Sequence, residues 1–193
     1  MNTMMITKQT MSLARQVLQA LLDEVTLTPK PGLVDLRSRG AHADLNWALM
    51  CHSACALQPV FQAMADAGAE GMADDALRQR IGAIGREGEA VMMAATGGVN
   101  THRGAIWALG LLVTAAAQLQ ERGDSLVPTA VAARAGALAR LARPATRASW
   151  PAASITSAAR AARRWPVFRT FSMSVCRRCM LRVRVATTTP RRA

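Results

Sequence analysis

Residues 95–104 gather side chains suited to chemistry in one short segment. They read Ala-Thr-Gly-Gly-Val-Asn-Thr-His-Arg-Gly, which places hydrogen-bond donors and acceptors, a titratable imidazole and a fixed cation between glycines. Glycine allows a positive φ and a close approach of the backbone to a ligand. Glycine-rich turns are also common connectors between helices, so the segment by itself supports a ligand-binding loop and a plain connector equally. Its candidate binding residues are Gly97, Gly98, Asn100, Thr101, His102, Arg103 and Gly104.

Three further polar clusters precede this turn. Glu24 is followed by Lys30 and Asp35, residues 40–44 read Gly-Ala-His-Ala-Asp, and Glu87 with Glu89 stands shortly before the turn. Carboxylates can hold Mg²⁺ or act as general bases, and cations together with glycine backbone bind phosphates. Loops that are not adjacent in sequence can meet at one end of an antiparallel helix bundle. Clusters that meet in this way suit chemistry on a polyphosphate.

Each cluster also has a simpler structural explanation. Glu89 can lie on a solvated helix face, as most charged residues do. Asp44 can cap the following helix, and His42 can be a partly buried histidine with no chemical role. The residue types alone leave both explanations open.

Apolar residues recur at helical spacing through the first 140 residues, with no strand-like alternation and no internal repeat. This pattern predicts an all-α helical bundle. Residues 105–120 are nearly all apolar, so we expect them to form the central buried helix, and we expect Asp44 to begin the second helix. The expected helices span residues 9–25, 44–67, 74–95, 105–120 and 129–141.

Charge divides the chain near residue 140. Residues 1–140 contain all 12 acidic residues and half of the 24 Lys and Arg, whereas residues 141–193 contain the other half, every one an Arg. We therefore divide the chain into an all-α part, residues 1–140, and an irregular Arg-rich tail, residues 141–193, expected to be disordered or loosely packed. Such a tail also suggests a different class of function, binding to nucleic acid or to an anionic surface, with a steep salt dependence.

Targeting signals are not evident in the sequence. The first residues lack an apolar core followed by a small-residue cleavage site, and the apolar run at residues 105–117 is shorter than the roughly 20 residues that span a bilayer. These features predict a cytoplasmic protein that does not act on a membrane.

Three motifs stand in order along the chain: EVTLTPKPGLVD at residues 24–35, GAHAD at residues 40–44 and ATGGVNTHRG at residues 95–104. Together they resemble the triphosphoribosyl-dephospho-CoA synthase family. Residues 40–65 resemble the malonate decarboxylase branch of that family more closely than the citrate lyase branch. The family pattern has Lys where this chain has Arg103, which keeps the charge but not the geometry of a point charge.

The resemblance implies a truncated version of an all-α enzyme that joins ATP, as a substrate, to 3'-dephospho-CoA and releases adenine. The product is the precursor of the prosthetic group on the acyl carrier subunit of a decarboxylase. Chemically, the 2'-hydroxyl of dephospho-CoA attacks C1 of the ATP ribose. That reaction needs a base, stabilisation of the ribosyl cation, a proton for adenine and a cationic or Mg²⁺ clamp on the triphosphate. Nucleic acid and membranes are not partners in this reaction, and the resemblance leaves the oligomeric state open.

The resemblance also suggests how the candidate residues divide the work. Glu24, Asp35 and Glu89 are candidates for the base and for binding Mg²⁺. His42 and His102 are candidates for proton transfer or phosphate contact. Lys30 and the residues of the glycine-bounded turn are candidates for binding the triphosphate.

The resemblance covers roughly residues 10–140. Family members continue with stretches similar to RGARGEA, GFP and GLPAL, which this sequence lacks. Back-translation of residues 156–181 with G/C-rich codons, read in the frame that starts on each third base, can give these stretches. We therefore hypothesise a frameshift near residues 140–147, which leaves two further alternatives for this chain: an inactive enzyme or a noncatalytic helical remnant.

Overall fold

The computed structural model describes residues 12–141, which form five helices and, within that range, no strand. The predicted all-α class is therefore confirmed, and the expected helices agree with the observed ones to within a few residues. The predicted Arg-rich tail lies outside the described residues. The helices are α1 (Leu13–Thr26), α2 (Trp47–Ala69), α3 (Asp74–Thr96), α4 (Arg103–Glu121) and α5 (Pro128–Arg140).

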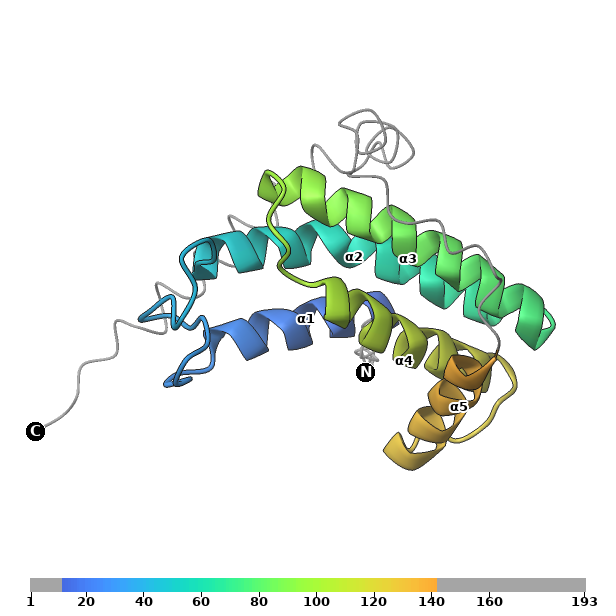
Figure 1. The fold of residues 1–193 in the computed structure, drawn as a ribbon. Helices are drawn as coiled ribbons and strands as arrows, with labels where there is room; N and C mark the ends of the chain where they lie inside the picture. The colour runs from blue at the N-terminus through green and yellow to red at the C-terminus, as the bar shows by residue number, and fades with distance from the viewer. Residues whose placement is uncertain (1–11, 142–193) are drawn as a thin grey trace, which may run out of the picture.

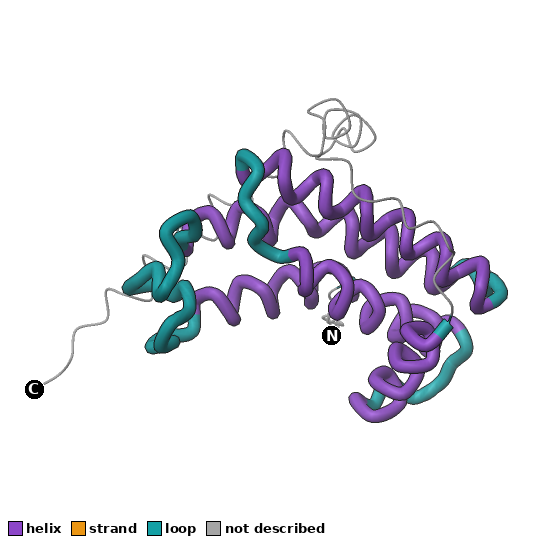
Figure 2. The backbone as a smooth tube through the Cα atoms, viewed as in Figure 1, coloured by secondary structure: helices purple, strands orange, loops and turns teal. Residues whose placement is uncertain are grey.

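Successive helices from α1 to α4 run side by side in alternating directions, and α5 crosses the far end of the bundle (Figure 1). This alternation brings the long loop between α1 and α2 and the turn between α3 and α4 toward the same end of the molecule (Figure 2). The other two connections lie at the opposite end. The bundle therefore places the conspicuous polar segments of the sequence near one another.

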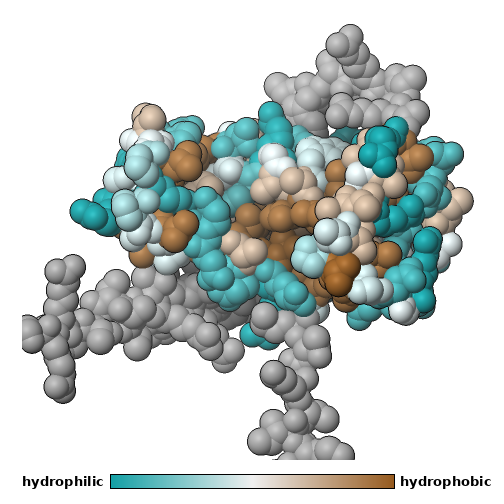
Figure 3. Space-filling view, turned by 90° about the horizontal axis from the view of Figure 1, so that it is seen from below, coloured by the Kyte–Doolittle hydropathy of each residue, from teal (hydrophilic) through white to brown (hydrophobic). Residues whose placement is uncertain are grey.

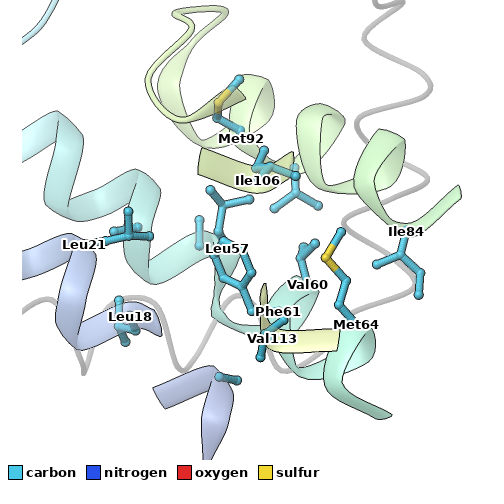
Figure 4. Close-up of a cluster of buried hydrophobic side chains, with 14 of the residues drawn as sticks. Leu18, Leu21, Leu57, Val60, Phe61, Met64, Ile84, Met92, Ile106 and Val113 are labelled. Atoms are coloured by element: carbon cyan, nitrogen blue, oxygen red, sulfur yellow. The ribbon is translucent and has the colours of Figure 1, made fainter. Parts of the chain in front are cut away.

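The core lies where α2 meets α1, α3 and α4 (Figure 4). Phe61 and Leu57 of α2 are fully buried there, between side chains of the neighbouring helices. A Cβ on Gly68 would stand 2.5 Å from the carbonyl oxygen of Thr114, so glycine lets α2 and α4 approach closely. Residues 105–120 lie within α4, the helix expected at the centre of the bundle. Helix α4 contacts all the others, but it buries eight residues against twelve in α2, and Leu112 is 38% exposed.

Helix α2 begins later than the sequence predicts. Asn46 has an extended backbone, and its side chain accepts a hydrogen bond of 2.9 Å from the backbone N–H of Leu49. Asparagine is a favoured cap in this geometry because it satisfies one of the unpaired N–H groups of the first turn. Asp44, the predicted cap, instead lies exposed in the preceding loop.

Helix α5 is attached to the bundle by the half-buried Arg134 and by two buried apolar side chains. Arg134 forms a two-pronged ion pair with Asp74 of α3, and its Nε donates to the side-chain oxygen of Gln118 at 2.8 Å. The ion pair lowers the pKa of Asp74 and raises that of Arg134, because each charge stabilises the other. Leu138, which is fully buried, and Ala135, which is also buried, supply the apolar contacts.

The underside of the bundle carries an open groove of about 650 Å³. Polar and apolar side chains of α1, α2, α4 and α5 share its lining, and apolar atoms are visible among hydrophilic ones on this face (Figure 3). Within residues 12–141, no helix has both the length and the apolar character that a membrane crossing requires.

Candidate active site

Asp35 organises the loop between α1 and α2. Its Oδ2 accepts hydrogen bonds from the Thr28 hydroxyl and the Lys30 backbone N–H, and its Oδ1 accepts from the backbone N–H groups of Arg37 and Ser38, all within 3.1 Å. These hydrogen bonds, that of Thr28 above all, lower the pKa of Asp35 well below its usual range because they favour the charged form. Four donors fill the acceptor positions of one carboxylate. Asp35 therefore holds the loop together, and its predicted role as base or metal ligand would require breaking that arrangement.

The same loop folds back on itself at Gly40. Gly40 has φ +58°, and a Cβ there would stand 2.5 Å from the Gly32 carbonyl group and the Leu33 carbonyl oxygen. The backbone N–H of Ala41 donates to the Gly32 carbonyl at 3.1 Å, which closes the fold. The glycine of the GAHAD motif is thus explained by local backbone geometry.

Glu24 and Lys30 form an ion pair where α1 gives way to this loop. The Lys30 ammonium donates to the Glu24 carboxylate at 2.7 Å and to the Glu24 carbonyl at 2.8 Å. The Lys30 side chain is only 10% exposed, whereas that of Glu24 is 57% exposed. The structure therefore presents the carboxylate to solvent and fixes the ammonium behind it.

The turn between α3 and α4 is built from glycine and hydroxyl groups. Gly97 ends α3 in the left-handed conformation, Gly98 also has a positive φ, and the Gly98 N–H donates to the Met93 carbonyl at 2.9 Å. The Thr96 hydroxyl bonds the Val99 carbonyl at 2.6 Å. Asn100 Oδ1 accepts from the backbone N–H of Arg103, the first residue of α4. These contacts explain most of the polar residues of the turn as structural groups.

His102 is the buried titratable group of this turn. It is 5% exposed, its Nδ1 lies 3.0 Å from the hydroxyl of Ser53 on α2, and that hydroxyl lies 2.6 Å from the hydroxyl of Thr101. Its backbone N–H points at the sulfur of Met92 at 3.1 Å. Burial lowers the pKa of His102 to about 4, and the negative charge of Glu24 acts in the opposite direction. His102 is therefore neutral at pH 7 and lies within the electrostatic reach of Glu24.

Glu89 is buried under the start of α4 rather than exposed on a solvated face. Its Oε1 accepts from the indole N–H of Trp107 at 3.1 Å, and its Oε2 lies 3.3 Å from Nε of Arg103. The Arg78 guanidinium stands over the Trp107 ring, 5.6 Å from its centroid. Glu89 thus anchors Arg103, whose outer surface is exposed.

Two predicted site features are not brought together. His42 lies exposed in the loop, and the structure places no hydrogen bond on its side chain. Across residues 12–141, no three His, Cys, Asp or Glu side chains group as a metal site would require. The assignment of Glu24, Asp35 and Glu89 as candidate Mg²⁺ ligands stays a prediction.

Comparison with known proteins decides the family. Residues 10–174 match the model of the family described as ATP:dephospho-CoA triphosphoribosyl transferase. The chain belongs to this family. The match includes every motif of the candidate site and runs past residue 141, beyond the range over which the sequence motifs predict resemblance.

Curated relatives of the transferase family carry matching names. The chain is 54% identical over 155 residues to the 2-(5''-triphosphoribosyl)-3'-dephosphocoenzyme-A synthase of Klebsiella pneumoniae, covering 80% of this chain and 52% of the relative. It is 61% identical over 124 residues to the probable synthase of Azotobacter vinelandii, covering 63% of this chain and 41% of the relative. The chain thus spans about half the length of the curated relatives it matches. No solved structure matches it.

Two residues that contact the candidate side chains, Ser53 and Trp107, could not be identified from the sequence. Ser53 lies in an apolar stretch of α2, and its one signal is that it is a polar residue on a face that is otherwise buried. Trp107 was counted among the apolar residues of α4, although buried tryptophan usually finds an acceptor for its N–H. Both residues gain their roles from contacts with another helix, which local sequence does not reveal.

Proposed function

We propose that residues 12–141 supply part of the active site of a synthase that joins ATP to 3'-dephospho-CoA and releases adenine. The single observation that carries this proposal is the convergence, at one end of the bundle, of the Glu24–Lys30 pair with the neutral His102. The names printed for the relatives support the same reaction.

The chemistry requires one proton to leave a hydroxyl and one to reach adenine. The 2'-hydroxyl oxygen of dephospho-CoA forms a bond to C1 of the ATP ribose, and the bond from C1 to adenine breaks. A base takes the hydroxyl proton, and adenine leaves with the bonding electrons and takes up a proton. Glu24 is exposed enough to meet a substrate, and a neutral His102 has a ring nitrogen able to accept a proton.

The triphosphate is assigned to the exposed cation and the open backbone of the turn. Arg103 faces solvent while Glu89 fixes its Nε, which orients the guanidinium. A Cβ on Gly97, Gly98 or Gly104 would meet nothing within 4 Å, so the backbone there is open to a ligand. Glycine backbone and arginine together suit phosphate oxygens.

Adenine release from ATP and 3'-dephospho-CoA tests the proposal directly. Glu24→Gln, Lys30→Met, Asn100→Ala and His102→Ala should each lower the rate. Glu70→Gln, an exposed carboxylate at the opposite end of α2, is the matched control and should leave the rate unchanged. Full activity in all four site variants would refute the assigned site. Calorimetric titration with ATP and with dephospho-CoA separates a binding chain from a noncatalytic remnant, which would bind neither.

We propose further that the product serves the acyl carrier subunit of a malonate decarboxylase, on the basis of the motif pattern at residues 40–65. Transfer of the product to a malonate decarboxylase carrier, in preference to a citrate lyase carrier, is the expected result. Equal transfer to both would remove the basis for choosing this branch.

A frameshift near residues 140–147 is also part of the proposal, supported by the abrupt change from mixed charge to arginine alone. The family match extends to residue 174, which is the result expected if the tail is translated in the correct frame. Sequencing the DNA across codons 135–160 decides between a frameshifted tail and a tail in the correct frame. An inserted or missing base relative to the genes of close relatives is the expected finding, and an uninterrupted frame would end the idea.

A further inference from the structure

Ser53 is a fully buried hydroxyl that joins two consecutive residues of the glycine-bounded turn. Its oxygen lies 2.6 Å from the Thr101 hydroxyl and 3.0 Å from Nδ1 of His102, and the Ser53 side chain itself is 0% exposed. Ala54, the next residue on α2, is buried too, and His52, the preceding one, is half-buried. A buried hydroxyl that makes no hydrogen bond is costly, so both contacts favour one fixed position of the turn against α2.

The row of groups from Thr101 through Ser53 to His102 can carry its protons in two ways. In one, the Thr101 O–H donates to Ser53, and the Ser53 O–H donates to an unprotonated Nδ1, which leaves the proton of the neutral ring on Nε2. In the other, Nδ1–H donates to Ser53, and the Ser53 O–H donates to Thr101, which leaves Nε2 unprotonated. A serine hydroxyl has one proton and two lone pairs, so it serves both arrangements.

Only the second arrangement makes His102 a base without moving any other proton. Its Nε2 accepts a proton while the hydrogen bond from Nδ1–H to Ser53 is kept. The imidazolium that forms is then stabilised by the nearby negative charge of Glu24, which acts on this ring in the structure. The hydrogen bond at one ring nitrogen thus decides what the other nitrogen can do.

We propose that Ser53 is a positioning residue for the synthase reaction, holding His102 with Nδ1 protonated toward α2 and Nε2 unprotonated toward the substrate hydroxyl. The proposal rests on the proposed function for the identity of the substrate. In the step itself, the 2'-hydroxyl proton of dephospho-CoA passes to Nε2 as the oxygen bonds to C1 of the ATP ribose, and the bond from C1 to adenine breaks, with adenine leaving with the bonding electrons and taking up a proton. Thr101 contributes by accepting a hydrogen bond from the Ser53 hydroxyl, so it acts through Ser53 rather than on the substrate.

Nitrogen NMR of the folded chain tests this arrangement without any turnover. The chain has three histidines, and His102→Gln assigns the signals of His102 by their loss. In the unmodified chain at pH 7 we expect Nδ1 to be protonated and Nε2 to be unprotonated. In Ser53→Ala we expect the ring to shift toward the form with Nε2 protonated. A ring protonated at Nε2 in the unmodified chain, or a tautomer unaffected by Ser53→Ala, overturns the proposal.

Thr114→Val is the matched control. Thr114 is a fully buried hydroxyl in the same α2–α4 interface, and it donates to the carbonyls of Met64 and Gly110. Losing it should leave the His102 signals unchanged, so a tautomer shift in this variant as well would reduce Ser53 to a structural role. If Ser53→Ala does not fold, Thr101→Val breaks the other end of the row, and it should produce a smaller shift in the same direction. No shift in a folded Thr101→Val then counts against the proposal.

Kinetics separate this proposal from the proposed function. Ser53→Ala should lower kcat for adenine release roughly 10²-fold, the ordinary scale of general base catalysis, with KM for ATP unchanged. If the unmodified chain releases no adenine but its His102 tautomer depends on Ser53, the positioning role stands and the proposed function fails. If the unmodified chain releases adenine and Ser53→Ala releases it at the same rate, the proposed function stands and the positioning role of Ser53 fails.

Discussion

The loop at residues 27–46 and the glycine-bounded turn at residues 95–104 lie at the same end of the bundle, but local structure explains less of the turn than of the loop. In the loop, both oxygens of Asp35 accept hydrogen bonds, four in all, from donors of the loop itself. Gly40 must be glycine because the backbone of Gly32 leaves no room for a side chain. In the turn, Gly104 has ordinary helical geometry and open space around it. Local structure accounts for the first set of residues and leaves Gly104 unexplained.

This difference separates residues that build the site from residues available to a ligand. A side chain whose hydrogen bonds are all made locally has little left for a substrate, whereas Glu24 and Arg103 each keep an exposed side beyond a single partner. The motifs of the family therefore mix two kinds of residue. Asp35 and Gly40 belong to the framework, whereas Glu24 and Arg103 are exposed and Gly104 has open space beside it, so these three remain available to a ligand.

Gly40→Ala is expected to damage the loop most severely. The new Cβ meets backbone atoms at 2.5 Å, in a conformation that L residues avoid, so we expect a loss on the order of 4 kcal/mol from strain and overpacking together. Gly32→Ala is the matched control, because Gly32 has a similar φ but nothing within 4 Å, and it should lose about 1 kcal/mol. Denaturant unfolding, with proteolysis within residues 27–46, measures both. Equal losses would show that the close approach is unimportant.

His102 should make the turn sensitive to acid in a different pH range from the loop. Its pKa is lowered to about 4 in the folded chain, so the unfolded chain binds more protons between about pH 6.5 and pH 4. The free energy of unfolding should have its full value above pH 6.5 and should fall by about 3 kcal/mol as the pH drops to 4. Denaturant unfolding at a series of pH values should show this fall, and His102→Gln should remove it. A variant with the same pH dependence as the unmodified chain would contradict the burial argument.

Asp35→Asn should open the loop partially, because the amide keeps one of the two acceptor oxygens. The pKa of Asp35 is lowered in the folded chain, so its stabilising contribution is present above about pH 4 and is lost as the pH falls further. We expect faster proteolysis within residues 27–46 at pH 7 and a weaker acid dependence below pH 4 than in the unmodified chain. Asp44→Asn, in the same loop but exposed, is the control. Identical proteolysis of the two variants would remove Asp35 from its organising role.

The helices could be predicted from the sequence because their apolar spacing reports directly on which face is buried. The common end of the polar clusters followed from the alternation of an antiparallel bundle. The cap of α2 could not be placed, because Asp44 and Asn46 are both good caps and only the backbone path of the loop selects Asn46. For Glu89 the charge pattern favoured a solvated helix face, and its burial could not be predicted because it depends on Trp107 and Arg103 from another helix.

Gly104→Ala has the smallest expected effect on folding, and it tests directly whether a residue that local structure does not explain serves a ligand. Alanine has no steric obstacle there, and it favours a helix over glycine, so stability should rise by about 0.5 kcal/mol. If the backbone at this position approaches the triphosphate, the added methyl group should weaken ATP binding in calorimetry at the same time. Gly136→Ala in α5 is the control, because its nearest foreign atom is the flexible end of Arg140, at 3.5 Å. It should gain similar stability and leave ATP binding unchanged. Unchanged ATP affinity in Gly104→Ala would mean that the turn is a connector. Local structure does not require glycine at position 104, and such a result would show that ATP binding does not require it either.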